Sequence, residues 1–412
     1  MSARPRIYLD NAATSFPKPA SVHEAMHLYA TSLGASPGRG AYHESVEGGR
    51  LIARCRARLA ALVNAPSPDH AVFTLNCSDA LNLAINGTAH AHRLRRLRNP
   101  SPRPIHFIAT RLDHNSVLRP LNALAADPLG DPIEWTCLPT EAATGLVTPD
   151  ALHAAIRPET ALVIAPHASN VSGTLQPLAD LGAVCRAAGV PFLVDAAQSA
   201  GRVPIDMDAD AVDLLAIPGH KYLMGPLGTG ALIIRPGLEE RITPARTGGT
   251  GTVSESDIHP ATMPDRYEPG SHNTLGIVGL SEGIAWLNDR TVESLWDAEQ
   301  QRTARVLDAL ADAAAFPGLT LLGPATPRHR VGVFSLTHDA LAPAELAAIL
   351  ESEFGILTRA GIHCAPRAHE HFGTRDSGGA TRISLGHFNT DAHIGALLDA
   401  LREICASTLP AR

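Results

Sequence analysis

Apolar residues recur along the chain in two patterns. Short continuous apolar runs occupy 71–75, 105–109, 161–165, 191–194, 213–217 and 230–235. Between them lie helical stripes, of which those over 49–63 and 177–188 are the clearest. Because strands that alternate with helices form a parallel sheet covered on both faces, this region predicts an α/β fold with a mostly parallel sheet flanked by helices.

The pattern changes after about residue 255. A helical stretch near 293–314 precedes strand-like runs at 319–322, 331–337, 356–359 and 382–385, and a closing helix is expected over 391–406. These elements predict a smaller α+β domain at the carboxyl end. The length of 412 residues agrees with this, since it exceeds what one hydrophobic core normally supports.

Composition and charge narrow the class of protein. The formal net charge is −7, so no overall basic field attracts nucleic acid, and no run of 18 apolar residues predicts a membrane span. The first residues show no apolar signal segment. Six widely spaced cysteines without a CxxC pair favour a reducing compartment. We expect a cytoplasmic protein that binds neither nucleic acid nor membrane.

One segment stands apart from the rest in composition. Residues 90–104 hold five arginines and three prolines. We interpret them as a solvated helix end followed by a loop. A docking patch for an acidic partner is the alternative, and the sequence does not decide the role of this segment.

A lysine in an unusual setting carries the first chemical signal. Lys221 follows the apolar run 214–217 inside a turn rich in glycine and proline, and Asp195 ends another apolar strand 26 residues upstream. A fixed amine can bind an aldehyde covalently, and a nearby carboxylate can keep a pyridine nitrogen protonated. Pyridoxal 5′-phosphate (PLP) requires this pair of groups.

Ordered motifs extend this signal over nearly the whole chain, from Tyr8-Leu9-Asp10-Asn11-Ala12-Ala13-Thr14 to Ser384-Leu385-Gly386. Between them lie Asp195-Ala196-Ala197-Gln198, Gly219-His220-Lys221 and Arg359-Ala360-Gly361-Ile362-His363-Cys364-Ala365. Together they resemble the class V, fold-type I PLP enzymes, and within them the second group of the cysteine desulfurase and selenocysteine lyase family.

The resemblance implies a set of cofactor ligands. Lys221 would bind the aldehyde, Asp195 would pair with the ring nitrogen, and Gln198 would contact the ring oxygen. The remaining ligands would be His220, Cys77 and Ser78 at the phosphate, His114 stacked on the ring, Asn170 at the ring oxygen, and Thr274 reaching the partner's cofactor across a dimer interface. Pro218 stands where many family members have a serine or threonine, so one hydroxyl ligand of the phosphate is absent.

The resemblance also implies how the substrate is bound and attacked. Arg382 would grip the α-carboxylate, with Asn170, Arg359 and Arg39 as further substrate ligands. Lys221 and His114 would take part in proton transfer. Cys364 would be the nucleophile that takes the sulfur as a persulfide.

The expected domains follow from the same resemblance. Residues 1–20 would pack with the small domain, 21–260 would form the large PLP-binding domain, 261–290 a dimer-contact and linker segment, and 291–412 the small α+β domain. A homodimer with shared active sites is implied.

The implied function is conversion of L-cysteine to L-alanine, with the sulfur passed from Cys364 to an acceptor protein or thiol. A selenocysteine lyase, a cysteine sulfinate desulfinase or a class V aminotransferase on the same scaffold remains open, and a non-catalytic scaffold protein of this fold is a more distant alternative. The sequence does not identify the acceptor or the pathway served. It also does not show whether sulfur, selenium or sulfinate is the preferred leaving group.

Overall fold

A seven-stranded sheet forms the centre of the larger part of the molecule. The computed structural model describes residues 6–38, 40–128 and 130–408. The strand order is β2 (Ala71–Thr74), β8 (Gly230–Ile234), β7 (Leu214–Pro218), β6 (Phe192–Asp195), β5 (Thr160–Pro166), β3 (Ile105–Thr110) and β4 (Ile133–Leu138). All neighbouring pairs are parallel except those that β8 makes with β2 and β7.

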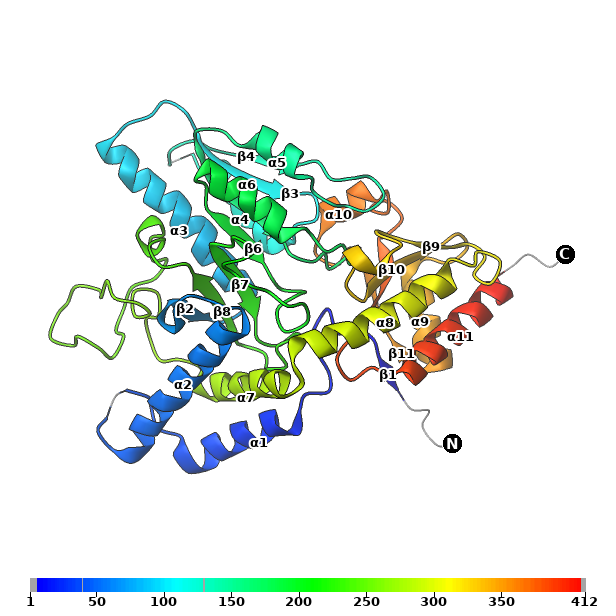
Figure 1. Ribbon diagram of the computed structural model, residues 1–412, viewed down its shortest axis with the longest axis horizontal. Coiled ribbons are helices and arrows are strands. Elements are labelled where there is room, and N and C mark those ends of the chain that lie inside the picture. The colour runs from blue at the N-terminus through cyan, green and yellow to red at the C-terminus, as the bar shows by residue number, and fades with distance from the viewer. Residues whose placement is uncertain (1–5, 39, 129, 409–412) are drawn as a thin grey trace.

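Helices cover both faces of this sheet because alternate strand residues point to opposite sides. On one face, Phe192 and Val194 join a core built with α2 (His43–Leu62), α5 (Pro149–Ala155), α6 (Leu178–Ala188) and α7 (Thr274–Arg290). On the other face, Leu193 joins a core built with α3 (Cys77–Arg98) and α4 (Asn115–Ala125). Helix α1 (Ala20–Leu28) lies along α7 on the outside (Figure 1).

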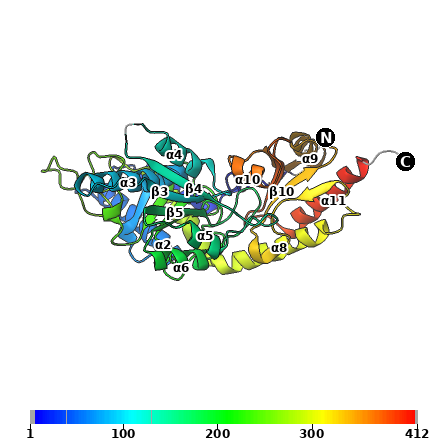
Figure 2. The same cartoon turned by 90° about the horizontal axis from the view of Figure 1, so that it is seen from above.

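The smaller part of the molecule is built on a four-stranded antiparallel sheet. Its order is β12 (Arg359–Gly361), β13 (Ala380–Ser384), β10 (Val333–His338) and β9 (Leu319–Leu321). Helices α8 (Val292–Leu310), α9 (Pro343–Phe354), α10 (Pro366–His371) and α11 (Asp391–Ser407) accompany it. The chain begins here as well, since β1 (Ile7–Tyr8) pairs in parallel with β11 (Ile356–Leu357). Figure 2 shows the two parts side by side, with α8 running from one to the other.

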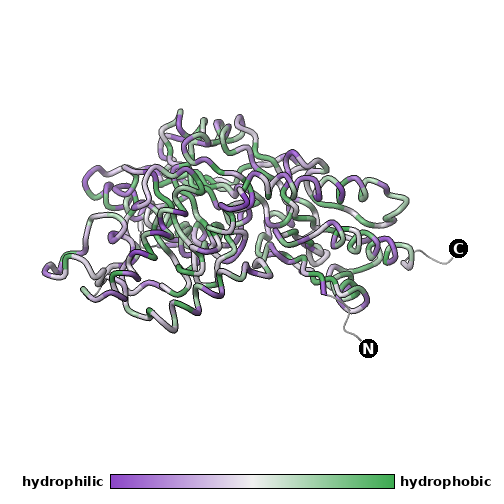
Figure 3. Tube along the Cα trace, turned by 60° about the horizontal axis from the view of Figure 1, so that its bottom comes forward, coloured by the Kyte–Doolittle hydropathy of each residue, from purple (hydrophilic) through white to green (hydrophobic). Residues whose placement is uncertain are grey.

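The predicted α/β fold class is confirmed, and each apolar run that predicted a strand contains one. Several elements escaped prediction, among them β4 and α7. Strand β4 carries an exposed glutamate and three half-buried residues, so it lacks a continuous apolar run. Helix α7 is buried on most sides and therefore shows no amphipathic stripe. Figure 3 shows hydrophobic segments in the interior of the larger part, and no helix in the described ranges is long and apolar enough to cross a membrane.

Candidate active site

A cavity of about 250 Å³ lies where the carboxyl ends of the central strands meet the smaller sheet. Pro166, Asp195 and Pro218 end β5, β6 and β7 and reach its wall. Arg359 and Arg382 enter from β12 and β13. Because parallel strands end at one edge of a sheet, side chains distant in sequence meet here, as is general for open α/β folds.

Lys221 and Asp195 both line this cavity. Burial lowers the pKa of Lys221, and the Asp195 carboxylate acts in the opposite direction. Burial likewise raises the pKa of Asp195, against the effect of a backbone hydrogen bond and of Lys221. Both shifts move toward neutral groups. They indicate a site in which burial disfavours the charged form of each group.

The partners of Asp195 leave one carboxylate oxygen open. Its Oδ1 accepts the Ala197 N–H at 2.9 Å and the Cys77 thiol at 3.4 Å. Within the described chain, no hydrogen bond reaches Oδ2. A second open acceptor is Oε1 of Gln198, which is buried without a partner while Nε2 donates to the Ala12 carbonyl at 3.0 Å. Buried acceptors without partners are costly, so the cavity is suited to a polar guest.

The turn that carries Lys221 is held from the amino-terminal segment. The His220 carbonyl accepts hydrogen bonds from Lys18 Nζ at 2.6 Å and from the Thr14 hydroxyl at 3.0 Å. Ser15 Oγ donates to the Lys221 carbonyl at 2.6 Å. Burial lowers the pKa of Lys18 to about 8. These contacts fix the position of the Lys221 backbone and place His220, which also lines the cavity, beside Thr14.

A helix N-terminus opens onto the same cavity. Asn76 caps α3, since its side chain accepts the Asp79 N–H at 3.0 Å, and Cys77 and Ser78 form the first turn. The free N–H groups of a first helical turn attract an anion such as phosphate. Ser78 Oγ lies 2.6 Å from Ser116 Oγ.

His114 caps α4 and lines the cavity next to this helix end. Its Nδ1 accepts the Ser116 N–H at 3.0 Å and lies 2.9 Å from Ser116 Oγ. With Nδ1 as acceptor, the ring proton sits on Nε2. Burial, followed by the charges of Lys221 and Arg359, lowers the pKa of His114 to about 4, so the ring is neutral. Ser116 thus connects the ring to the helix end.

Arg382 is 1% exposed and presents its guanidinium to the cavity. It forms an ion pair with Asp10 at 2.7 Å and donates to the Asn170 carbonyl at 3.2 Å, while Nε has no partner within the ranges described. Burial lowers the pKa of Arg382, and Arg359 adds to the effect. Two guanidinium groups beside one carboxylate leave a positive charge for an anionic substrate group.

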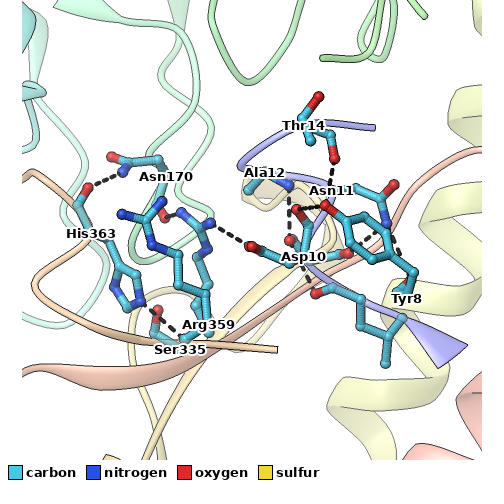
Figure 4. Close-up of polar contacts among 12 residues, drawn as sticks. Tyr8, Asp10, Asn11, Ala12, Thr14, Asn170, Ser335, Arg359 and His363 are labelled. Atoms are coloured by element: carbon cyan, nitrogen blue, oxygen red, sulfur yellow. Dashed lines mark hydrogen bonds and ion pairs between the residues drawn. The ribbon is translucent and has the colours of Figure 1, made fainter. Parts of the chain in front are cut away.

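Cys364 lies beside the cavity and does not line it. Its side chain is exposed, whereas the preceding His363 reaches the wall. Both residues have left-handed φ angles, 52° and 58°, which are uncommon outside glycine. Asn170 Nδ2 donates to the His363 carbonyl at 2.6 Å (Figure 4). The Asn115 N–H donates to the Cys364 carbonyl at 2.8 Å.

A buried chain of side chains supports this strained loop. His363 Nε2 lies 3.2 Å from the Arg359 carbonyl, so it carries the proton, and His363 Nδ1 accepts from His369 Nε2 at 3.3 Å. His369 Nδ1 in turn accepts from the Thr374 hydroxyl at 2.7 Å. Burial lowers the pKa of His363 to about 3 and that of His369 to about 4. Two neutral rings of fixed tautomer therefore anchor the loop.

The structure brings most of the predicted site residues to one cavity. These are Lys221, Asp195, Gln198, His220, Cys77, Ser78, His114, Asn170, Arg359 and Arg382. Thr274 is buried at the start of α7 and does not line this cavity. Arg39 lies outside the described residues.

Sequence reasoning assigned no role to Asp10, Ser116, Lys18, His369 and Thr374. Asp10 belongs to the recognised amino-terminal motif and Ser116 closely follows the candidate His114, whereas the other three carry no signal of spacing. Only the fold shows that Asp10 contacts Arg382, Ser116 contacts His114 and Lys18 contacts the His220 carbonyl, and that Thr374 and His369 support His363.

Comparisons with known proteins agree with this geometry. Residues 7–397 match a family model described as Aminotransferase class-V. A protein of Methanothermobacter thermautotrophicus described as "Probable cysteine desulfurase" is 31% identical over 405 residues, covering 97% of this chain and 95% of that protein. A cysteine desulfurase of Yersinia pestis is 29% identical over 414 residues, covering 98% of this chain and 94% of that protein.

Solved structures show the same fold. The apo structure of the cysteine desulfurase from Thermococcus onnurineus NA1 has a TM-score of 0.87 at 28% identity, covering 98% of this chain and 95% of that chain. The cysteine desulfurase CsdA from Escherichia coli has a TM-score of 0.83 at 25% identity, covering 98% of this chain and 96% of that chain.

Proposed function

The chain belongs to the aminotransferase class-V family, within which we propose that it is a PLP-dependent cysteine desulfurase. It would remove the sulfur of L-cysteine, release L-alanine and pass the sulfur to an acceptor protein or thiol. One observation carries the proposal. Lys221, Asp195 and Arg382 line a single cavity, and the loop after His363 places Cys364 beside it.

The residues of the cavity fit the cofactor that the family implies. Lys221 offers an amine for the aldehyde, and the open Oδ2 of Asp195 could accept a hydrogen bond from a protonated ring nitrogen. The Oε1 of Gln198, which has no partner, could accept a hydrogen bond from another polar group of the cofactor. The first turn of α3, with Cys77 and Ser78, suits the phosphate, and His114 provides a flat neutral ring. When bound, PLP supplies an electron sink that stabilises negative charge at the substrate Cα.

The protein groups then have separate tasks. Arg382 binds the substrate α-carboxylate, for which its free Nε and the neighbouring Arg359 provide donors. Asp195, charged once it is paired, holds the proton on the ring nitrogen. The Lys221 amine, whose pKa burial lowers, takes the proton from the substrate Cα.

The sulfur step uses the thiolate of Cys364. It attacks the substrate sulfur, a sulfur–sulfur bond forms, and the bond between the substrate Cβ and sulfur breaks. The electron pair of the broken bond stays with the carbon skeleton, which takes up a proton and leaves as alanine. Because the Cys364 side chain is exposed, the terminal persulfide sulfur is within reach of an acceptor thiol.

We also propose a homodimer. Apolar side chains near the start of α7 are exposed: Leu75 at 56%, Leu227 at 70% and Leu275 at 38%. If a partner subunit covers these side chains, the start of α7, with Thr274, would lie close to the cofactor of the partner subunit. Light scattering on the purified protein tests the dimer, and a monomer at micromolar concentration would contradict it.

The test of the proposed activity compares wild type with Cys364→Ala and with a control, Cys137→Ala, whose half-buried cysteine lies on β4. L-Cysteine should give alanine with wild type and with the control, and one added sulfur atom on Cys364 by mass spectrometry. Cys364→Ala should bind PLP and form no alanine from L-cysteine. Full turnover by Cys364→Ala would refute the persulfide route and favour a lyase or aminotransferase.

A further inference from the structure

Two adjoining cavities open at the amino-terminal edge of the large sheet, at the end of the strands opposite to the active site. The first, of about 220 Å³, lies between α3 and the starts of β5 and β7. The second, of about 310 Å³, lies where β8 ends. They share Gly189, Pro191, Leu238 and Arg241 in their walls. Together they have the size of a site for a small metabolite.

Arginines dominate the polar lining of this double cavity. Arg95 and Arg241 line the first cavity, and Arg186, Arg235 and Arg241 line the second. Arg235 is paired with Asp213 at 2.5 Å. Among the described residues, no carboxylate lies within ion-pair distance of Arg95, Arg186 or Arg241. The double cavity therefore holds a surplus of positive charge.

Arg241 lines both cavities and so lies between them. Burial, followed by the charges of Arg95, Arg96 and Arg241, lowers the pKa of His92 to about 4. On the other side, burial raises the pKa of Asp213, while a hydrogen bond from the Phe192 N–H and the charges of Arg235, Arg186 and Arg241 act against the rise. Arg241 is thus close enough to act on groups of both cavities, and an anion bound there would meet guanidinium groups from both sides.

The first cavity is lined by apolar side chains as well as by arginines. Ala161, Pro191, Leu214, Leu238 and Ile242 form apolar walls. The hydroxyls of Thr88 and Thr160 are the uncharged polar groups beside them. An apolar slot next to a cluster of guanidinium groups suits a flat ring that carries phosphate groups. A bare phosphate would leave this apolar wall without a contact.

We propose that this double cavity is a binding site for a nucleoside phosphate. The base lies in the slot between α3 and the strand starts, and the phosphates lie on Arg241 with Arg95 and Arg186 around them. The site is separate from the proposed catalytic cavity, so the proposal stands or falls independently of the proposed function.

The test is calorimetric titration of the PLP-loaded protein with magnesium-free ADP, with adenosine and with pyrophosphate. ADP should bind, and adenosine and pyrophosphate should each bind at least tenfold more weakly. Arg241→Gln and Arg95→Gln should each weaken ADP binding at least tenfold. Arg98→Gln is the matched control, because this exposed arginine lies on the same helix and does not line the cavities, and it should bind ADP as wild type does.

Each other result would overturn the proposal. Absence of ADP binding at millimolar concentration contradicts the site. Equal affinity for ADP and pyrophosphate contradicts the slot for the base. Equal weakening by Arg98→Gln and Arg241→Gln shows a general surface charge effect in place of a site.

Discussion

Replacement of Asp195 by asparagine tests the electronic part of the proposed function. The carboxylate is buried, and its Oδ1 is held by the Ala197 N–H at 2.9 Å and the Cys77 thiol at 3.4 Å. Asparagine can keep those contacts with its amide oxygen, so the fold should be retained. The change removes the negative charge of Oδ2, which would otherwise hold the proton on the ring nitrogen of PLP.

The magnitude follows from the loss of one partner of a buried ion pair. Such a loss typically costs about 3–5 kcal/mol. If all of it falls on the transition state, the rate decreases by roughly two to four orders of magnitude, since about 1.4 kcal/mol corresponds to a factor of ten. We therefore expect alanine formation from L-cysteine by Asp195→Asn to be about 10²- to 10⁴-fold slower than by wild type.

A matched control uses Asp113, a second buried carboxyl group close to the site. Burial raises its pKa to about 8, so the group is largely protonated at pH 7. Asp113→Asn exchanges one neutral group for another and should keep nearly the wild-type rate. The assay is the initial rate of alanine formation at saturating PLP, with circular dichroism to verify the fold. A near-native rate for Asp195→Asn with full cofactor occupancy would show that Asp195 does not pair with the ring nitrogen.

Three further predictions address other parts of the site. Lys221→Ala should abolish turnover and the visible absorbance of bound PLP, and normal turnover of the purified variant would remove Lys221 from its assigned role. Asp113 should lower the free energy of unfolding of the wild type relative to that of Asp113→Asn as the pH rises from about 4 to about 8, because its native pKa of about 8 exceeds its ordinary value of 3.8 and the native state binds the proton more tightly. Urea denaturation at several pH values measures this difference, and an identical pH dependence of the two proteins would refute the assignment. His369→Phe should lower kcat for L-cysteine and leave KM nearly unchanged, because His369 supports His363 and thereby positions the strained Cys364; an unchanged kcat would show that the loop does not depend on His369.

Local sequence was sufficient for most elements of the fold. The strands of the large sheet are buried on both faces, so their apolar runs were visible without any knowledge of their neighbours. Strand β4 was missed because it lies at the edge of the sheet and carries polar residues. Helix α7 was missed because it is enclosed by α1, α2 and the sheet, which leaves no polar face to create a period.

The candidate site shows the same division. Its principal groups belong to motifs that can be recognised in the linear sequence. All four of them line the cavity, namely Lys221, Asp195, His114 and Arg382. The contacts that support them join distant segments: Asp10 meets Arg382 across more than 370 positions, and Lys18 holds the turn before Lys221 across about 200. No local pattern encodes such pairs.

The sequence by itself predicted the fold class and the residues of the candidate site, because the motifs that carry them can be recognised along the chain. Tertiary structure alone decided the pairing of Asp10 with Arg382, the left-handed Cys364 loop with its histidine support, and the arginine-lined double cavity. The physical reason is that these features arise where separate strands and helices end, the site at the carboxyl edge of the large sheet and the double cavity at its amino edge. Their free energy comes from burial and from hydrogen bonds between segments, and only the folded chain brings those segments together.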